Sequence, residues 1–539
     1  MSKRGSVVAI ALLLTACGDN SLDGPSGGGG SGGEGEAAGG STANISGGMG
    51  GTGGQTDLPN WEPCALDTGA TDDDAECATI QVPVRYDVSA GMIPLFIKRV
   101  RPLRPARAHL WLLQGGPGAA GNGWEPFVRQ MQPLLPDVEF YLPDHRGTGR
   151  SAKLECPNAE ATGSPGGSAI TDEEWPACAQ HLSSQWGDNL AGFSSENAAR
   201  DIELAIGMTR AEDTRVVLYG ASYGTTWGHR FLQLFPSGAV DAVVLDSTNW
   251  PDRTYEDYDQ LWEGAAHRLF DACTMDAQCG GALGPDPWQA LRDLYSSLDA
   301  GHCSALADVG ITSEVLRYAV AWSVAYAELR GSGLALVRRA IRCNPEDEDA
   351  IVHYVDALFG PGGLLTFEDP LFSEVLSHHI LESEVHRADL SSTAKAFAET
   401  CTVCIGAGAI PFDPDWPRYA FDGELTMWTT SSTPVLIMNG GMDPFAPSHR
   451  LFEAGVEAAF DGPNQYVVDF PAAAHGTVTS SKVTGIDEPP CGLQLFMHLL
   501  ENPAEPLDLA CTASLAPPDF SVPAPTASFL FGTPDAWGE

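Results

Sequence analysis

The stretch VVLYGASYGTT, residues 216–226, decides the fold that the sequence predicts. Residues of strand character run directly into a Gly-x-Ser-x-Gly turn, and a helix-compatible segment follows at 227–234. A strand, a sharp turn and a helix in that order form a nucleophile elbow, which lifts the serine hydroxyl above a sheet. Gly220 and Gly224 lack a Cβ atom, so the turn can take strained dihedral angles. Ser222 is therefore the predicted nucleophile; the alternative is a chance match in a glycine-rich chain.

A second glycine-rich turn precedes the elbow. Residues 108–113 have the pattern of a buried strand, which ends at QGGPG, residues 114–118. Bare backbone N–H groups after a core strand can bind the negative oxygen of a tetrahedral intermediate. We expect the N–H groups of Gly116 and Tyr223, the residue after the nucleophile, to form this oxyanion hole. The alternative is a plain surface turn.

The general base and its acidic partner are expected after two later strands. Asp443 follows the predicted strand at 433–438, and His475 follows the predicted strand at 465–470. The chain order Ser222, Asp443, His475 is the order in which nucleophile-elbow enzymes place their triad. Asp246, at the end of the strand after the elbow helix, is a rival for the acid.

Two further histidines near these motifs are not assigned to catalysis. His145 lies inside the turn DHRGTGRS, residues 144–151, and precedes the nucleophile, so its expected role is structural. His449 lies close to Asp443 in sequence but before the last strand.

Three motifs together carry a family resemblance. QGGPG at 114–118, DHRGTGRS at 144–151 and GASYGT at 220–225 resemble the α/β-hydrolase group that contains proline iminopeptidases and secreted tripeptidyl aminopeptidases. The residues after the elbow serine are more similar to the tripeptidyl aminopeptidase branch. The resemblance covers about residues 58–511, and it departs from the family at Gln114, where a histidine is usual.

The resemblance implies an α/β fold, the α/β-hydrolase fold, with a mostly parallel central sheet and an inserted helical cap. It implies a serine aminopeptidase of the tripeptidyl or prolyl type, whose substrates are peptides with a free N-terminus, and which needs no cofactor. The alternative is a carboxylic ester hydrolase that uses the same triad. A binding protein on an inactive hydrolase fold is disfavoured because all three catalytic positions are occupied.

The change from strand to helix patterns divides the body of the chain. We expect residues 58–250 and 432–539 to form the two halves of the core and residues 251–431 to form the cap, with helix patterns at 313–342 and 347–358. An exopeptidase must bind a free ammonium, and Glu382 and Glu384 are candidate cap carboxylates for it.

Histidines 378, 379 and 386 do not complete a ligand pattern, so they are interpreted as surface residues and no metal is expected.

The first 57 residues are expected to be a targeting signal and a tether. Residues 1–17 combine two basic residues, an apolar run and the sequence LTAC, which is similar to the lipobox of bacterial lipoproteins. Cys17 is the expected lipidation site, although an ordinary secretory signal would also fit. Residues 18–57 are rich in glycine and serine, a composition that predicts a flexible linker. The protein is thus predicted to be an exported lipoprotein, anchored in a membrane through Cys17 at the periplasmic or extracellular face of the cell envelope.

Charge and cysteine content agree with export. A formal net charge of -42 argues against nucleic acid as a partner, because few cations are available to neutralise phosphates. Besides Cys17 the chain has 12 cysteines, an even set that predicts disulfides in an exported protein. The predicted pairs join neighbours in the sequence: 64 with 77, 156 with 178, 273 with 279, 491 with 511, and 401 with 404.

Overall fold

A mostly parallel sheet forms the centre of the fold. The computed structural model describes residues 58–539 except 168, 366–368, 422, 447–454 and 486–487. The sheet has nine strands in the order β1-β2-β3-β5-β4-β6-β7-β8-β9, parallel from β5 to β9 and antiparallel at the other edge. The strands are β1 Glu62–Cys64, β2 Ala75–Pro83, β3 Met92–Val100, β4 Ala108–Leu113, β5 Val138–Pro143, β6 Arg215–Ala221, β7 Ala242–Asp246, β8 Val435–Gly440 and β9 Gln465–Phe470. This sheet confirms the predicted fold class.

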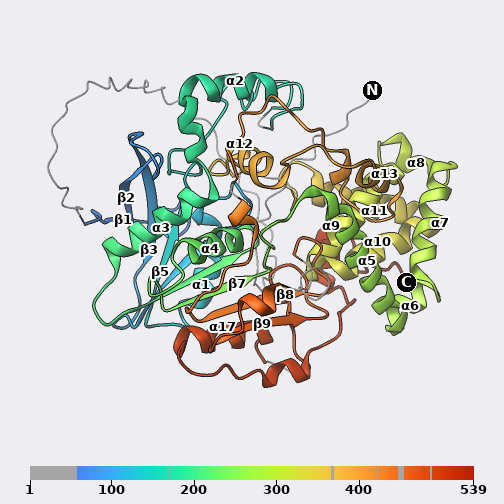
Figure 1. The fold of residues 1–539 in the computed structure, drawn as a ribbon. Coiled ribbons are helices and arrows are strands. Elements are labelled where there is room, and N and C mark those ends of the chain that lie inside the picture. The colour runs from blue at the N-terminus through green and yellow to red at the C-terminus, as the bar shows by residue number, and fades with distance from the viewer. Residues whose placement is uncertain (1–57, 168, 366–368, 422, 447–454, 486–487) are drawn as a thin grey trace.

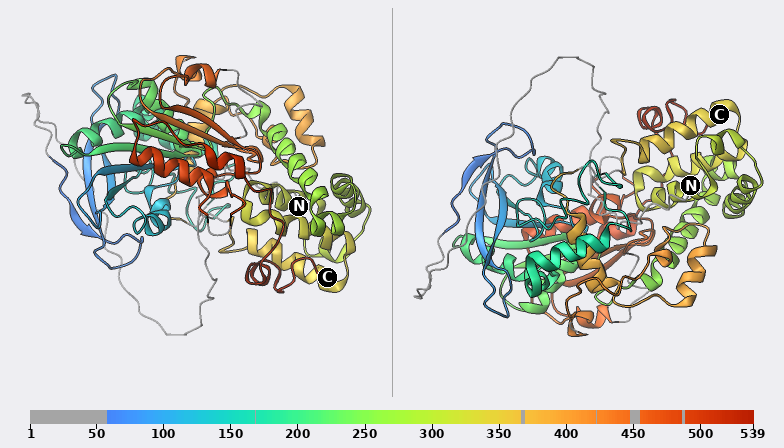
Figure 2. Two further views of the ribbon diagram at one scale, coloured as in Figure 1. Left: turned by 90° about the horizontal axis from the view of Figure 1, so that it is seen from below. Right: turned by 90° about the horizontal axis from the view of Figure 1, so that it is seen from above.

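Helices cover both faces of the sheet because its strands are apolar on both sides. Along β4, Trp111 and Leu113 face one cluster of buried side chains, and Leu110 and Leu112 face another. Figures 1 and 2 show α3 and α4 on one face and α17 on the opposite face. The helices on the two faces are α1 Glu125–Met131, α2 Trp175–Trp186, α3 Ser195–Thr209, α4 Tyr223–Leu234, α15 Val456–Ala459, α16 Thr477–Ser480 and α17 Cys491–Glu501.

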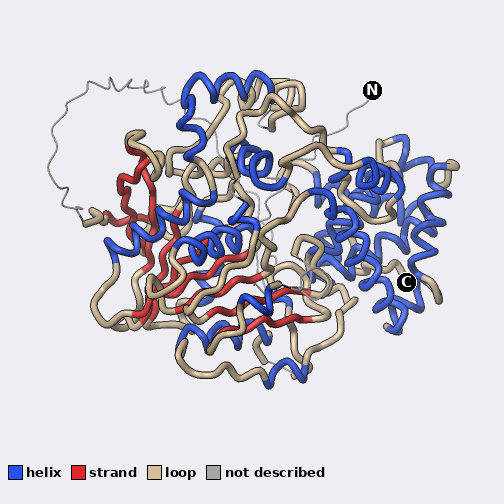
Figure 3. The backbone as a smooth tube through the Cα atoms, in the orientation of Figure 1, coloured by secondary structure: helices blue, strands red, loops and turns tan. Residues whose placement is uncertain are grey.

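The chain between β7 and β8 is helical and forms a body beside the sheet, drawn mainly as blue tube in Figure 3. This cap has its own apolar core, which includes Trp262, Trp322 and Tyr354. Its helices are α5 Tyr258–Met275, α6 Ala277–Leu283, α7 Pro287–Asp299, α8 Ser304–Asp308, α9 Ser313–Ala325, α10 Arg330–Arg342, α11 Pro345–Phe359, α12 Glu374–Ile380 and α13 Ser392–Thr400. Short 3-10 segments are η1 Gly121–Trp124, η2 Gly187–Gly192, η3 Tyr255–Asp257, η4 Ala327–Leu329, η6 Ala407–Ala409, η7 Gly423–Thr426 and η8 Ala510–Ser514, and η5 Leu381–Val385 is a π-helix.

The C-terminal segment packs on the cap. Helix α18, Ala524–Phe531, lies against α11, where Phe531 contacts the ring of Tyr354 at a centroid distance of 4.8 Å. Arg339 of α10 donates to the carbonyl of Ala536 at 2.6 Å. This placement differs from the predicted division, which assigned all of 432–539 to the core, because the apolar side chains of α18 are buried among cap helices.

Six disulfides lie within the described residues. They include all five predicted pairs, which are confirmed, and a sixth between Cys303 and Cys343. Three of the six, those at 273–279, 303–343 and 401–404, lie within the cap.

Candidate active site

The elbow between β6 and α4 holds Ser222 in a left-handed conformation, with φ 55° and ψ -125°. Its N–H donates to the carbonyl of Asp246 at 3.0 Å, which ties the turn to the neighbouring strand β7. Glycine is required on both sides. A Cβ atom on Gly220 would lie 2.2 Å from the carbonyl oxygen of Gly224, and one on Gly224 would lie 2.1 Å from that of Leu113. The close packing of strand, turn and helix therefore fixes the apex serine.

The loop predicted to supply the oxyanion hole lies against this serine. A Cβ atom on Gly115 would lie 3.2 Å from the Cβ of Ser222, and Gly116 has φ 121°. The N–H of Gly115 donates to Oε1 of Gln114 at 2.7 Å, so the carboxamide of Gln114 supports the loop at the position where histidine is usual. Gly116 and Tyr223 thus lie on two segments that flank Ser222, as an oxyanion hole requires.

Asp443 and His475, which are 32 residues apart in sequence, are brought together beyond the ends of β8 and β9. Nδ1 of His475 lies 2.8 Å from Oδ2 of Asp443, and both side chains are buried. The other oxygen of Asp443 accepts the N–H groups of Phe445 at 2.9 Å and Ala446 at 3.1 Å. These donors orient the carboxylate and stabilise its charge, so His475 carries its proton on Nδ1 and presents a free lone pair on Nε2.

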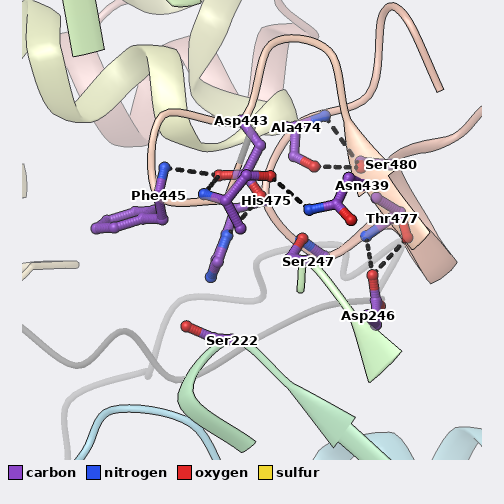
Figure 4. Close-up of polar contacts among 12 residues, drawn as sticks. Ser222, Asp246, Ser247, Asn439, Asp443, Phe445, Ala474, His475, Thr477 and Ser480 are labelled. Carbon is purple, nitrogen blue, oxygen red and sulfur yellow. Dashed lines mark hydrogen bonds and ion pairs between the residues drawn. The ribbon is translucent and has the colours of Figure 1, made fainter. Parts of the chain in front are cut away.

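Figure 4 shows the free end of the His475 ring directed towards the hydroxyl of Ser222. The two side chains do not hydrogen-bond in this structure. Contacts between a nucleophile and its base are often longer without substrate and shorten in the complex. The arrangement fits a serine nucleophile with a histidine base and a buried carboxylate behind it.

Asp246, the rival for the triad acid, has a different role. It is fully buried at the end of β7 and does not bond to His475. Its carboxylate accepts from the Tyr219 hydroxyl at 2.7 Å, from the N–H groups of Thr477 at 2.6 Å and Val478 at 3.1 Å, and from the Thr477 hydroxyl. Asp246 therefore anchors the loop that carries His475 (Figure 4), and Asp443 is the carboxylate that contacts the His475 ring.

Sequence reasoning did not anticipate the link between His145 and the elbow. Nδ1 of His145 donates to the carbonyl of Arg146 at 2.7 Å, so Nε2 accepts the hydroxyl of Tyr223 at 3.1 Å. Burial lowers the pKa of His145 to about 3, which keeps the imidazole neutral and able to accept this bond. The turn thereby contacts the residue predicted to supply one oxyanion N–H.

The charged residues on either side of His145 bind other parts of the core. Asp144 accepts the N–H groups of Gly121 and Arg150, both at 2.9 Å. Arg146 is fully buried and pairs with Asp201 of α3.

Both candidate cap carboxylates are buried and already have protein partners. Glu384 accepts from the N–H of Ser195 at 3.1 Å, from its hydroxyl at 2.8 Å and from the hydroxyl of Tyr419. It also lies 3.8 Å from the guanidinium of Arg230. These bonds join the start of α3 to the cap segment, which is a structural role.

The carboxylate of Glu382 has fewer hydrogen-bond partners than that of Glu384. One of its carboxylate oxygens accepts Nδ1 of His386 at 2.8 Å, and the other pairs with Arg418. Each oxygen of Glu382 thus has one partner among the described residues.

The histidines at 378, 379 and 386 are not surface residues, contrary to the interpretation from the sequence. His379 and His386 are buried, and the His378 ring stacks on Trp175 at 3.9 Å. Burial lowers the pKa of His379 to about 4, so its ring is neutral. Each histidine contacts the ring of an aromatic neighbour.

One group of possible metal ligands occurs among the described residues, formed by Cys303, Cys343 and Glu348. The two sulfur atoms form a disulfide, so neither is free as a thiolate ligand.

Cys17 and His449 lie outside the described residues, as do the predicted signal and tether at 1–57. Within the part of the chain that the structure covers, no helix is both long and apolar enough to cross a bilayer.

Comparison with known proteins agrees with the fold. The family described as the alpha/beta hydrolase fold matches residues 108–274, which include β4, the elbow and β7. No curated protein sequence matches the chain significantly. The strand order, the elbow and the family match together establish the α/β-hydrolase fold.

Solved structures similar to this chain have several activities. An esterase from Exiguobacterium antarcticum is 15% identical, with 72% of this chain and 90% of that chain covered and a TM-score of 0.28. A proline iminopeptidase from Mycobacterium smegmatis is 15% identical, with 74% and 91% covered and a TM-score of 0.26. A bromoperoxidase from Bacillus anthracis is 13% identical, with 72% and 90% covered and a TM-score of 0.28.

Proposed function

We propose that the protein is a serine exopeptidase that hydrolyses peptide bonds near the free N-terminus of peptides, in the manner of a tripeptidyl or prolyl aminopeptidase. The observation that carries the proposal is the bond of 2.8 Å between Asp443 and His475, beside a serine held at a positive φ. A neutral histidine fixed by a buried carboxylate is the base that an unactivated hydroxyl needs in order to attack a carbonyl.

The proposed reaction has two halves. Nε2 of His475 takes the proton of the Ser222 hydroxyl as its oxygen attacks the substrate carbonyl, and then gives it to the leaving amine. Asp443 stabilises the imidazolium without being protonated. The N–H groups of Gly116 and Tyr223 bind the oxyanion. Water then attacks the acyl carbonyl while His475 takes its proton, and His475 returns that proton to the Ser222 oxygen as the acid product leaves.

Exopeptidase selectivity requires a group that binds the substrate ammonium. Of the two cap carboxylates, Glu384 accepts three hydrogen bonds from the protein, whereas Glu382 accepts one on each oxygen. Carboxylate oxygens offer about four lone-pair sites in total, so Glu382 retains capacity for a further N–H donor. We therefore assign the ammonium site to Glu382 rather than Glu384 within this proposal.

The second candidate function is carboxylic ester hydrolysis on the same triad. It is favoured by one observation: both cap carboxylates already pair with cationic or N–H groups of the protein. An esterase needs no ammonium site, and the remaining machinery would be identical.

We also propose that the enzyme is exported and held at a membrane by a lipid on Cys17. The disulfides support an oxidising compartment, because cytosolic thiols are kept reduced. Metabolic labelling with a radioactive fatty acid tests this: the wild type should incorporate the label, and Cys17→Ser should not. Equal labelling of the two chains would contradict the assignment.

The activity is tested with the purified chain and a panel of chromogenic substrates: prolyl, alanyl and tripeptidyl amides with free amines, the same tripeptide with a blocked amine, and a short-chain nitrophenyl ester. Ser222→Ala is the inactive control. Cleavage of a free-amine substrate but not of its blocked form supports the aminopeptidase, and Glu382→Gln should then raise KM for that substrate far more than for the ester. Turnover of the ester alone would replace the aminopeptidase with the esterase.

A further inference from the structure

The cap reaches the candidate active site at a break between two of its helices. The helix pattern at 313–342 predicted one continuous helix, but α9 ends at Ala325 and α10 begins at Arg330. Between them Tyr326 is extended, with φ -112° and ψ 126°. The last carbonyls of a helix have no partner within it, and the carbonyl of Ala325 accepts the N–H of His475 at 3.1 Å. A cap helix therefore holds the backbone of the proposed base.

Arg330, the first residue of α10, binds the loop that carries Asp443 and the loop that carries His475. Its guanidinium donates to the carbonyl of Met442, the residue before Asp443, at 2.9 Å. It donates to the carbonyl of Ala472, on the loop before His475, at 2.7 Å. In a third bond, Arg330 donates to the carbonyl of Val324 in α9 at 3.1 Å. One side chain of the cap thus joins the loop that carries Asp443 to the loop that carries His475.

Arg330 carries a buried positive charge. The residue is 2% exposed, and no carboxylate of the described residues lies within ion-pairing distance of it. It stands at the start of α10, where the helix dipole disfavours a cation. Burial lowers its pKa to about 10, while the nearby carboxylates of Asp443 and Glu328 oppose this shift, so Arg330 remains a cation at neutral pH.

We propose that Arg330 is a positioning residue for the triad, one that sets both the geometry and the charge balance of the Asp443–His475 pair. The inference rests on the proposed function, because it assigns Arg330 a role in that reaction. Two of its bonds tie the loop before Asp443 and the loop before His475 to the cap, and the third goes to Val324 of α9. The cation also lies close enough to Asp443 for the two opposite charges to attract each other, so it contributes to the charge balance of the pair.

Other charged and titratable groups also face this pair. Arg268 of α5 donates to the carbonyl of Gly441. Burial raises the pKa of Tyr258 of α5 and of Tyr326, and the nearby charge of Asp443 adds to the rise. Asp246 binds the loop on the core side. Among the described groups that face the pair, Arg330 alone bonds to both loops, so its removal should affect both together.

The test compares Arg330→Met and Arg330→Lys with the matched control Arg339→Met. Arg339 belongs to the same helix, is equally buried, and bonds to Asp347 and to the carbonyl of Ala536, away from the triad. Two quantities are measured: the pH dependence of the rate at which a fluorophosphonate labels Ser222, and the pKa of His475 from the NMR signals of its ring, assigned by their loss in His475→Gln.

For Arg330→Met we expect the labelling rate at its plateau to fall about tenfold or more, because misplaced catalytic groups lose reactivity steeply. We also expect the pKa of His475 to rise by about one unit, since a nearby positive charge is removed. Arg330→Lys should lose rate but keep the His475 pKa within about 0.3 units, because it retains the charge and loses the planar set of bonds. Arg339→Met should change neither quantity.

An unchanged His475 pKa in Arg330→Met, or equal loss of rate in the Arg330 and Arg339 variants, would overturn the proposal. If Arg330→Met does not fold, Arg330→Lys decides: a wild-type rate in that variant would also overturn it. If the wild type is not labelled at all, the proposed function fails, while the NMR titration still decides whether Arg330 controls the pKa of His475.

Discussion

Replacing Asp443 by asparagine tests the proposed triad most directly, because the structure predicts which way the new side chain must point. One oxygen of Asp443 accepts two backbone N–H groups, from Phe445 and Ala446. In Asp443→Asn the amide oxygen must keep that position, because the amide nitrogen cannot accept from two donors. The NH2 group then faces Nδ1 of His475, which has to become an acceptor, and the ring proton moves to Nε2.

The His475 tautomer with its proton on Nε2 cannot act as the general base, although the packing around it is unchanged. A histidine protonated on Nε2 cannot take the proton of Ser222, and the corresponding change in a serine protease lowers kcat by about 10⁴. This equals about 5 kcal/mol of lost transition-state stabilisation. The free energy of unfolding should change by less than about 1 kcal/mol, because the two backbone bonds are kept.

Asp246→Asn is the matched control, since Asp246 is equally buried but binds the loop rather than the ring of His475. Its two oxygens accept four donors, from Tyr219, Thr477 and Val478. An amide can accept on one side only, so we expect a loss of about 2–4 kcal/mol in unfolding free energy. The rate of the folded fraction should fall less than about tenfold.

The assay combines the rate of fluorophosphonate labelling with urea unfolding followed by tryptophan fluorescence. The reasoning would be refuted by the opposite pattern: Asp443→Asn that is still labelled rapidly, and folded Asp246→Asn that is not labelled.

Three further predictions concern stability, each measured by urea unfolding. Burial raises the pKa of Glu374 to about 7, so its contribution to stability is present below pH 4.5 and is lost as pH rises through 7. Glu374→Gln should therefore stabilise the protein by about 1–3 kcal/mol at pH 8 and by almost nothing at pH 4.5. Gly224→Ala should destabilise by about 3 kcal/mol or more, because the new Cβ would lie 2.1 Å from the Leu113 carbonyl. Glu384→Ala should cost about 3 kcal/mol, because it leaves the buried Arg230 without its carboxylate.

Gly224→Ala and Glu384→Ala each have a control in the same fold, and Glu374→Gln is checked by its own pH dependence. Gly207→Ala places a Cβ in open space within α3 and should be neutral or stabilising by about 0.5–1 kcal/mol. Glu399→Ala removes an exposed carboxylate and should cost less than about 0.5 kcal/mol. A pH-independent effect of Glu374→Gln, or losses in Gly224→Ala and Glu384→Ala no larger than in these controls, would contradict the explanation given.

The strands and the elbow were predictable because their causes are local. β4, β6, β8 and β9 lie within about two residues of their predicted positions, since buried parallel strands are short, continuous apolar runs. Five disulfides were predictable because their cysteines are near neighbours in the sequence, whereas Cys303 and Cys343, 40 residues apart, were not paired.

The sequence favoured Asp443 over its rival Asp246, and the tertiary structure shows which of the two contacts His475. Asp246 ends β7 and Asp443 lies just beyond β8, and the position of the loop after β9 places the ring of His475 against Asp443. The histidines of the cap were misjudged for the same kind of reason, because they contact residues far away in the chain, as His378 contacts Trp175.

The sequence by itself determined the sheet, the position of the candidate nucleophile and the order of the candidate triad, because strand patterns and turn glycines act over a few residues. Only the tertiary structure decided how the cap engages the site. The break after Ala325 and the bonds from Arg330 to Met442 and Ala472 join residues more than a hundred positions apart in the chain. Such contacts depend on how helices and loops pack in space, and no local pattern of residue types encodes them.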